Sequence, residues 1–162
     1  MSEFRISLRI THPKMPSDEI TKSLELAPIF SYTAGDKKLT PKGTEIPGRR
    51  KESYWCHDVP ASADDIESNI ADCNAILANR RDVLLRIVDS GGRVEYFVGW
   101  FSSDNSGFVL RHELLRQLAD LRIDLSFDLY TTERGGGNHV GTNAPKKAAH
   151  KKKQKKPRRG PR

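Results

Sequence analysis

The seventeen residues that end the chain constrain its fold most, because they cannot contribute to a core. Residues 146–162 contain ten Lys or Arg and no Asp or Glu, whereas the whole chain of 162 residues has a formal charge of +7. Residues 1–145 therefore carry −3, and the basic character belongs to the tail. Blocks of lysine repel one another and bury no apolar surface, so we expect a disordered tail. Only the preceding, mildly acidic part of the chain, which we call the body, is therefore expected to fold.

A glycine run marks the expected end of the folded part. Gly135, Gly136 and Gly137 follow a strand-like pattern and precede the tail, and such clusters typically mark boundaries. We predict one globular domain over residues 1–134 and a Gly-then-Lys/Arg-rich tail over 135–162. A body of that length can bury a core. No stretch approaches the roughly 20 apolar residues that a membrane span needs.

The N-terminus and the cysteines suggest a location. The first residues run into an alternating pattern without the apolar core of a signal peptide, so we expect a cytoplasmic protein. Cys56 and Cys73 are then expected to be reduced, partly buried thiols, because disulfides are rare in the cytosol. The five histidines are scattered without the spacing of metal ligands. The sequence thus predicts no metal and no cofactor.

Alternation of apolar and polar residues predicts strands over 4–10 and 123–130. A further strand is expected near Tyr54–His57, with Trp55 in the core. The segments 83–88 and 94–101 flank Asp89-Ser90-Gly91-Gly92. Because glycine supplies the positive φ of a tight turn, we predict a hairpin there.

Capping residues and apolar spacing predict three helices. Ser17 is the expected N-cap of a short helix that ends at Pro28, and Asp18 and Glu19 follow it. Residues 62–65 resemble a capping box that opens a helix of about seventeen residues, with Arg80 and Arg81 in its last turn. Leucines between 110 and 121 predict the third helix. Arg111 stands where a Ser or Thr cap would be expected.

The predicted order is β-α-(loop)-β-α-β-β-α-β. Strands of this kind suit an α+β fold, in which an antiparallel sheet has its helices on one face. The second half, a helix, a hairpin, a helix and a strand, has a ferredoxin-like character.

Several segments carry a family resemblance. They are Ile10-Thr11-His12-Pro13, Pro16 to Thr21, Leu24 to Pro28, Gly35-Asp36-Lys37, Trp55, the Leu-rich helix and the strand Asp124–Tyr130. With these residues the chain resembles the uncharacterised bacterial family called domain of unknown function 4279, over roughly residues 3–132. The resemblance implies a small intracellular bacterial domain and no catalytic residues.

Three sets of residues are candidates for a site. The longest irregular stretch, 28–53, holds a basic group that either grips an anionic partner or is a solvated connection: Lys37, Lys38, Arg49, Arg50 and Lys51. If the first and last strands are neighbours, polar residues on them form cross-strand ion pairs or a sheet-face site: Arg5, Arg9, Asp124 and Asp128. The third set is the tail.

The tail is the stronger functional signal. Each Lys or Arg near a phosphate can release a counterion, so a cationic tail binds RNA or DNA without sequence readout. Residues 135–162 contain no aromatic side chain that could stack on a base. The tail residues predicted to contact nucleic acid are Lys146, Lys147, Lys151, Lys152, Lys153, Lys155, Lys156, Arg158, Arg159 and Arg162. A tail that only solubilises, or contacts a membrane surface, remains an alternative.

No nucleophile with a base and no phosphate-binding loop stands out, so the sequence predicts a non-enzymatic protein of unknown biochemical activity. Gly135–Gly137 precedes a tail and not a helix, which excludes a phosphate loop there. The alternative function is a protein-binding or toxin-neutralising module that acts through the acidic body.

Overall fold

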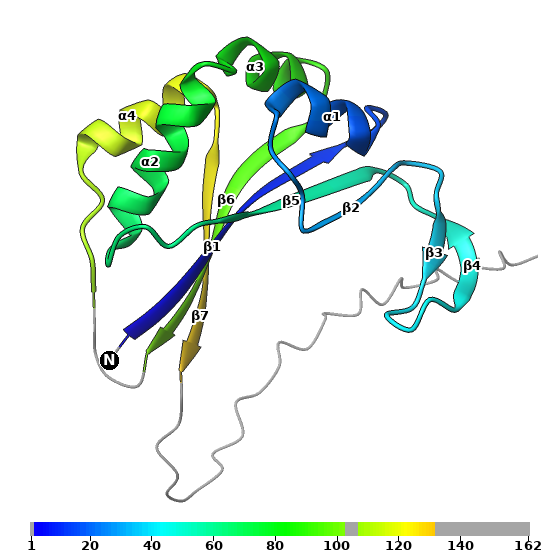
Figure 1. Ribbon diagram of the computed structural model, residues 1–162, viewed down its shortest axis with the longest axis horizontal. Coiled ribbons are helices and arrows are strands. Elements are labelled where there is room, and N and C mark those ends of the chain that lie inside the picture. Colours follow the sequence, from blue (N-terminus) through cyan, green and yellow to red (C-terminus); the bar gives the residue numbers. More distant parts are fainter. Residues whose placement is uncertain (1, 103–106, 132–162) are drawn as a thin grey trace, which may run out of the picture.

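The computed structural model describes residues 2–102 and 107–131, which form four helices and seven strands (Figure 1). The predicted tail, 135–162, lies outside these residues. The helices are α1 (Ser17–Leu24), α2 (Ile66–Ala78), α3 (Arg81–Asp89) and α4 (His112–Leu121). The strands are β1 (Ser2–His12), β2 (Phe30–Tyr32), β3 (Lys37–Leu39), β4 (Glu45–Arg49), β5 (Ser53–Val59), β6 (Arg93–Ser102) and β7 (Asp124–Thr131).

Five strands form one sheet in the order β2-β5-β1-β6-β7, and the helices cover one of its faces (Figure 1). This confirms the α+β fold. The sheet is mixed and not wholly antiparallel, because α4 crosses over and returns β7 parallel to β6. The order does not confirm the ferredoxin-like arrangement. It also separates β1 from β7 by β6.

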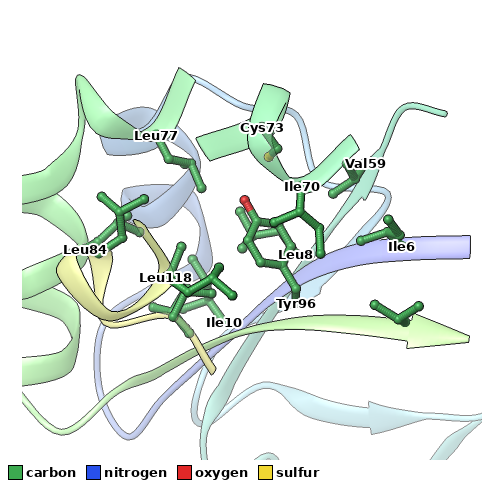
Figure 2. Close-up of a cluster of buried hydrophobic side chains, with 14 of the residues drawn as sticks. Ile6, Leu8, Ile10, Val59, Ile70, Cys73, Leu77, Leu84, Tyr96 and Leu118 are labelled. Carbon is green, nitrogen blue, oxygen red and sulfur yellow. The ribbon is translucent and has the colours of Figure 1, made fainter. Parts of the chain in front are cut away.

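The core lies between the sheet and the helices, and Figure 2 shows part of it. Ile6, Leu8 and Ile10 alternate along β1 and are all buried, as predicted. Tyr96 of the neighbouring strand is fully buried in the same cluster, and α2, α3 and α4 contribute side chains from the helix layer. Burial of an aliphatic or aromatic side chain contributes about 1.5–3 kcal/mol each. Cys73 belongs to this core, and neither it nor Cys56 forms a disulfide.

The predicted hairpin between residues 83–88 and 94–101 is wrong in its first half. Residues 94–101 lie in β6, but residues 83–88 lie in α3. The two glycines end this helix: Gly91 has a φ of +95° and donates to the Val88 oxygen, while Gly92 donates to the Ile87 oxygen. This is the Schellman pattern, which needs glycine for the same reason as a tight turn does.

Helix starts differ from the predictions by a few residues. Pro16, and not Ser17, is the N-cap of α1, although Asp18 and Glu19 do occupy its first turn. The helix ends at Leu24, before Pro28, and the next residue takes a left-handed conformation.

The second helix begins one turn later than predicted. Asp65 caps α2 by accepting the N–H of Ser68 at 2.8 Å, whereas the Ser62 hydroxyl donates to Asp72. The hydrogen bonds from Ser68 hold the pKa of Asp65 below its ordinary value. Arg80 and Arg81 are not in the last turn of α2, since a break places them at the start of α3. Arg111 is the N-cap of α4, without a capping side chain.

Residues 28–53 are more regular than predicted. The strand β2 adds an edge to the sheet by pairing with β5, and β3 pairs with β4 in a separate two-stranded hairpin. Figure 1 shows this hairpin, which we call the basic hairpin (residues 36–51), projecting from the sheet. It lies where β5 begins.

The register defines two ends of the sheet. At one end Ser2 is paired with Ser102, which is itself paired with Thr131, the last described residue. At the other end His12 is paired with Ser53, directly after the basic hairpin. The basic hairpin and the exit of the chain from β7 therefore lie at opposite ends.

Candidate binding site

The basic hairpin concentrates positive charge on an otherwise acidic domain. Residues 36–51 carry six Lys or Arg and two Asp or Glu. The other described residues carry eleven Lys or Arg and seventeen Asp or Glu. The hairpin thus has a net charge of +4 against −6 for the rest, and is the part of the described domain most suited to an anion.

The fold places the five predicted loop cations differently. Lys37 ion-pairs with Glu45 at 3.0 Å, and Arg49 donates to the Gly35 oxygen at 2.9 Å. Lys38 alternates with Lys37 along β3 and is half-buried, and Lys51 is exposed at the end of the hairpin, after β4. Arg50 differs from the others, because its side chain turns toward the edge of the sheet.

Three aromatic rings lie at this edge. Phe30 and Tyr32 of β2 lie beside Tyr54 of β5 on the face of the sheet opposite the helices. The rings of Tyr32 and Tyr54 are stacked with centroids 5.6 Å apart, and Phe30 meets Tyr32 edge-on at 5.9 Å. The Arg50 guanidinium carbon lies 4.0 Å from the centroid of Tyr32, a cation–π contact. Sequence reasoning found Arg50 but missed these rings.

Partial burial affects the ionisation of the Tyr54 phenol in this cluster. It raises the pKa of Tyr54 to about 12, and the neighbouring Cys56 adds to the effect while Arg9 opposes it. Tyr54 therefore stays neutral at physiological pH, and the positive charge at the edge belongs to arginine.

A pocket of about 850 Å³ opens between β2 and the basic hairpin. Its walls are mostly apolar and include the Phe30 and Tyr32 rings, Leu39 and Pro41, with Arg50 among its charged side chains. The Arg50 Nε is buried and has no hydrogen-bond partner, alone in this respect among buried side-chain N and O atoms of the described residues. An unpaired buried donor costs about 1–3 kcal/mol, more for a charged group. The wall of the pocket therefore contains an arginine whose hydrogen-bonding capacity is not fully used.

The open face of the sheet has a second arginine stack. The Arg9 guanidinium carbon lies 3.4 Å from the Phe97 centroid, and Phe101 stacks on Tyr130 at 4.7 Å. The polar residues predicted to pair between the first and last strands do not do so, because β6 lies between β1 and β7. They are Arg5, Arg9, Asp124 and Asp128. Arg9 is instead opposite Glu95.

Arg5, Asp124 and Asp128 also form no ion pair between β1 and β7. Asp124 accepts from Arg93 of β6 at 3.0 Å, and Asp128 accepts from Tyr130. Arg5 and Asp128 lie on either side of Gly99 in the register. The cross-strand ion pairs predicted between the first and last strands are therefore wrong.

His12 is the most buried histidine among the described residues and is held as a structural group. Its Nδ1 accepts the N–H groups of Lys14 and Met15, so the proton lies on Nε2 and is donated to the Ser90 hydroxyl at 3.0 Å. This is the reverse of a base that activates a serine. Burial lowers the pKa of His12, and Glu19 partly offsets this.

The other histidines of the described part contact neighbouring groups. His57 contacts the Ala27 oxygen and His112 contacts Glu113. No group of three or more His, Cys, Asp or Glu within residues 2–102 and 107–131 is placed to hold a metal ion. A groove of about 550 Å³ between α2 and α4 has Asn74 in its lining, but that amide already bonds Tyr96 and Gln117.

Comparison with known families identifies the family of the chain. The family described as Domain of unknown function (DUF4279) matches residues 2–132 of the chain. The chain belongs to this family. The match covers every strand and helix of the DUF4279 domain and stops before the tail. No curated protein and no solved structure matches the chain. No helix within the described residues is long and apolar enough to cross a membrane.

Proposed function

We propose that this DUF4279 protein is a non-catalytic binding domain that its C-terminal tail attaches to nucleic acid in the bacterial cytoplasm. The observation that carries the proposal is the separation of charge: ten cations without an acid in residues 146–162, joined to an acidic domain. Such a tail binds polyanions by counterion release, irrespective of sequence. The lack of disulfides between the two cysteines fits a reducing compartment.

The test compares the full chain with a full-length variant in which the ten tail cations become Gln. Fluorescence anisotropy with a 20-nucleotide RNA and a 20-base-pair DNA is measured at several salt concentrations. If six phosphates are contacted on RNA, the logarithm of the binding constant falls with that of salt with a slope of about −4. We expect the variant to lose this binding, as does a chain that ends at Arg134. Equal binding by wild type and variants would overturn the proposal.

Exposed apolar residues support a second function, binding of a protein partner or neutralisation of a toxin by the body. Val109 and Leu129 are 73% and 69% exposed, and the partly exposed Phe108 and Phe127 rings meet nearby at 5.2 Å. Large exposed apolar patches commonly mark protein contacts. A pull-down with the Gln-tailed variant should then retain a partner that Leu129→Ser loses. If the pull-down retains no protein above background, this second function is contradicted.

A further inference from the structure

The pocket between β2 and the basic hairpin combines flat apolar walls with a cation that has an unused donor. The ring of Phe30, 55% exposed, and that of Tyr32 supply the flat surfaces. Arg50 supplies the charge and the buried Nε without a partner. Its volume of about 850 Å³ lies within the range of small-molecule sites, about 300–1,000 Å³.

We infer that this pocket binds a nucleotide unit, a flat ring that carries a phosphate. The ring stacks against the exposed Phe30 ring and the Arg50 guanidinium, which Tyr32 supports from below, and the phosphate pairs with the positive charge of that guanidinium. Nucleobases stack both on aromatic rings and on arginine planes. The nucleotide is either free or part of a nucleic-acid strand, and the strand-bound form rests on the function proposed above.

The charges in the pocket favour an anion and identify Arg50 as its partner. Lys37 is already ion-paired with Glu45, and the Asp36 carboxylate accepts the N–H of Thr33 at 2.7 Å. Within residues 2–102 and 107–131, the Arg50 guanidinium lies over the Tyr32 ring and forms no salt bridge with a carboxylate. A ligand with a negative charge is favoured, because charge-assisted hydrogen bonds to a guanidinium are stronger than neutral ones.

The backbone holds Arg50 in place without help from a ligand. Its N–H donates to the Asp36 oxygen at 2.9 Å, and its oxygen accepts from Gly35 at 2.8 Å. Tyr32 is fixed by its pairing with Tyr54 in the sheet. The stack is therefore formed before binding, and ordering these two side chains adds little to the cost of association.

Isothermal titration calorimetry of the full chain tests this with three probes: adenosine 5′-monophosphate, adenosine and inorganic phosphate. We expect the monophosphate to bind more tightly than either part alone. Arg50→Gln and Tyr32→Leu should each weaken it about tenfold or more, the scale of one lost base stack. Arg9→Gln, which removes the matching arginine stack outside the pocket, should change affinity less than twofold.

Competition with hexa-adenylate RNA distinguishes the two sources of the nucleotide. If the RNA displaces the monophosphate and binds more tightly, the site takes a strand; if it does not displace it, the site takes a free nucleotide. Thermal melting of Arg50→Gln, whose backbone contacts are kept, shows that weaker binding is not unfolding.

The inference is overturned if the monophosphate does not bind at millimolar concentration, if phosphate binds as tightly as the monophosphate, or if Arg9→Gln loses as much affinity as Arg50→Gln. Repeating the titration on the Gln-tailed variant separates this site from the tail. Unchanged binding of the monophosphate there supports the pocket even if the tail proposal fails.

Discussion

Gly92, between α3 and β6, has no room for a side chain, and its replacement by alanine tests the packing at this junction. A methyl group there would lie 2.7 Å from Ile87 Cγ2, 2.8 Å from His12 Cδ2 and 2.8 Å from the Ile87 backbone oxygen. The side chains can shift, but that oxygen accepts the N–H of Gly92 itself at 2.9 Å. Gly92→Ala must therefore displace the end of α3 from β6.

The magnitude follows from two opposed effects. Overpacking typically costs about 1–3 kcal/mol, and a clash with backbone puts this case near the upper limit. Alanine returns about 0.4–1 kcal/mol by restricting the unfolded chain. We expect a net loss of about 2 kcal/mol in the free energy of unfolding. For a domain of this size the melting temperature falls by roughly 6–10 °C.

Urea unfolding followed by circular dichroism measures the change, with Gly99→Ala as the matched control within β6. A methyl group on Gly99 would find its nearest atoms at 3.6, 3.8 and 3.9 Å, which is ordinary contact. This control should lose less than about 0.5 kcal/mol. If both variants lose equal stability at unchanged m values, the close approach at Gly92 does not determine the fold there.

Three further predictions concern buried polar groups. Tyr96→Phe removes the donor that Asn74 Oδ1 accepts at 2.9 Å and should cost about 1–3 kcal/mol in urea unfolding; a loss below 0.5 would contradict it. Trp55→Phe removes the 2.9 Å bond from Nε1 to Thr21 Oγ1 and should cost about 1–2 kcal/mol, beyond a surface control. The pKa of His12 is lowered in the folded state. Its contribution to the free energy of unfolding is therefore complete when the pH is above the pKa of the unfolded state, about 6.5. It is lost as the pH falls through the lower pKa of the folded state. Melting temperatures between pH 7.5 and 5.5 should fall more in wild type than in His12→Gln, and parallel curves would exclude this role.

The strands with one buried face could be predicted because burial repeats every second residue. Ile6, Leu8 and Ile10 carry that pattern in β1, and residues 94–101 carry it in β6. The family resemblance, confirmed over residues 2–132, followed from motifs in these same segments.

The prediction failed at α3 because two signals conflicted. Its composition, rich in β-branched residues, and the following glycines favoured a hairpin. Yet Val83, Leu84, Ile87 and Val88 recur at helical spacing, and the middle two are buried. Glycine reports a positive φ, which ends helices as readily as it joins strands.

The candidate site could be predicted only in part. The cluster of cations around Arg50 is visible in the sequence, but its contact with Tyr32 depends on the pairing of a strand of three residues with β5. So short a strand has no periodicity to detect. The ten tail cations lie outside the described residues, and their contact with nucleic acid stays a prediction.

The pocket and the point where the chain leaves β7 lie at opposite ends of the sheet, and this affects how the two proposed binding activities combine. Thr131 lies in the same row of the sheet as Ser2 of β1, and Tyr32 of the pocket lies in the same row as Thr11. These two rows are nine residues apart along β1, about 30 Å at 3.3 Å per residue. When the tail binds a nucleic acid and the pocket binds a free nucleotide, the two sites share no partner and their binding free energies add. A variant that joins Arg50→Gln to the Gln tail should therefore lose the sum of the two single losses. A domain held at one end of the sheet would keep its pocket open at the other.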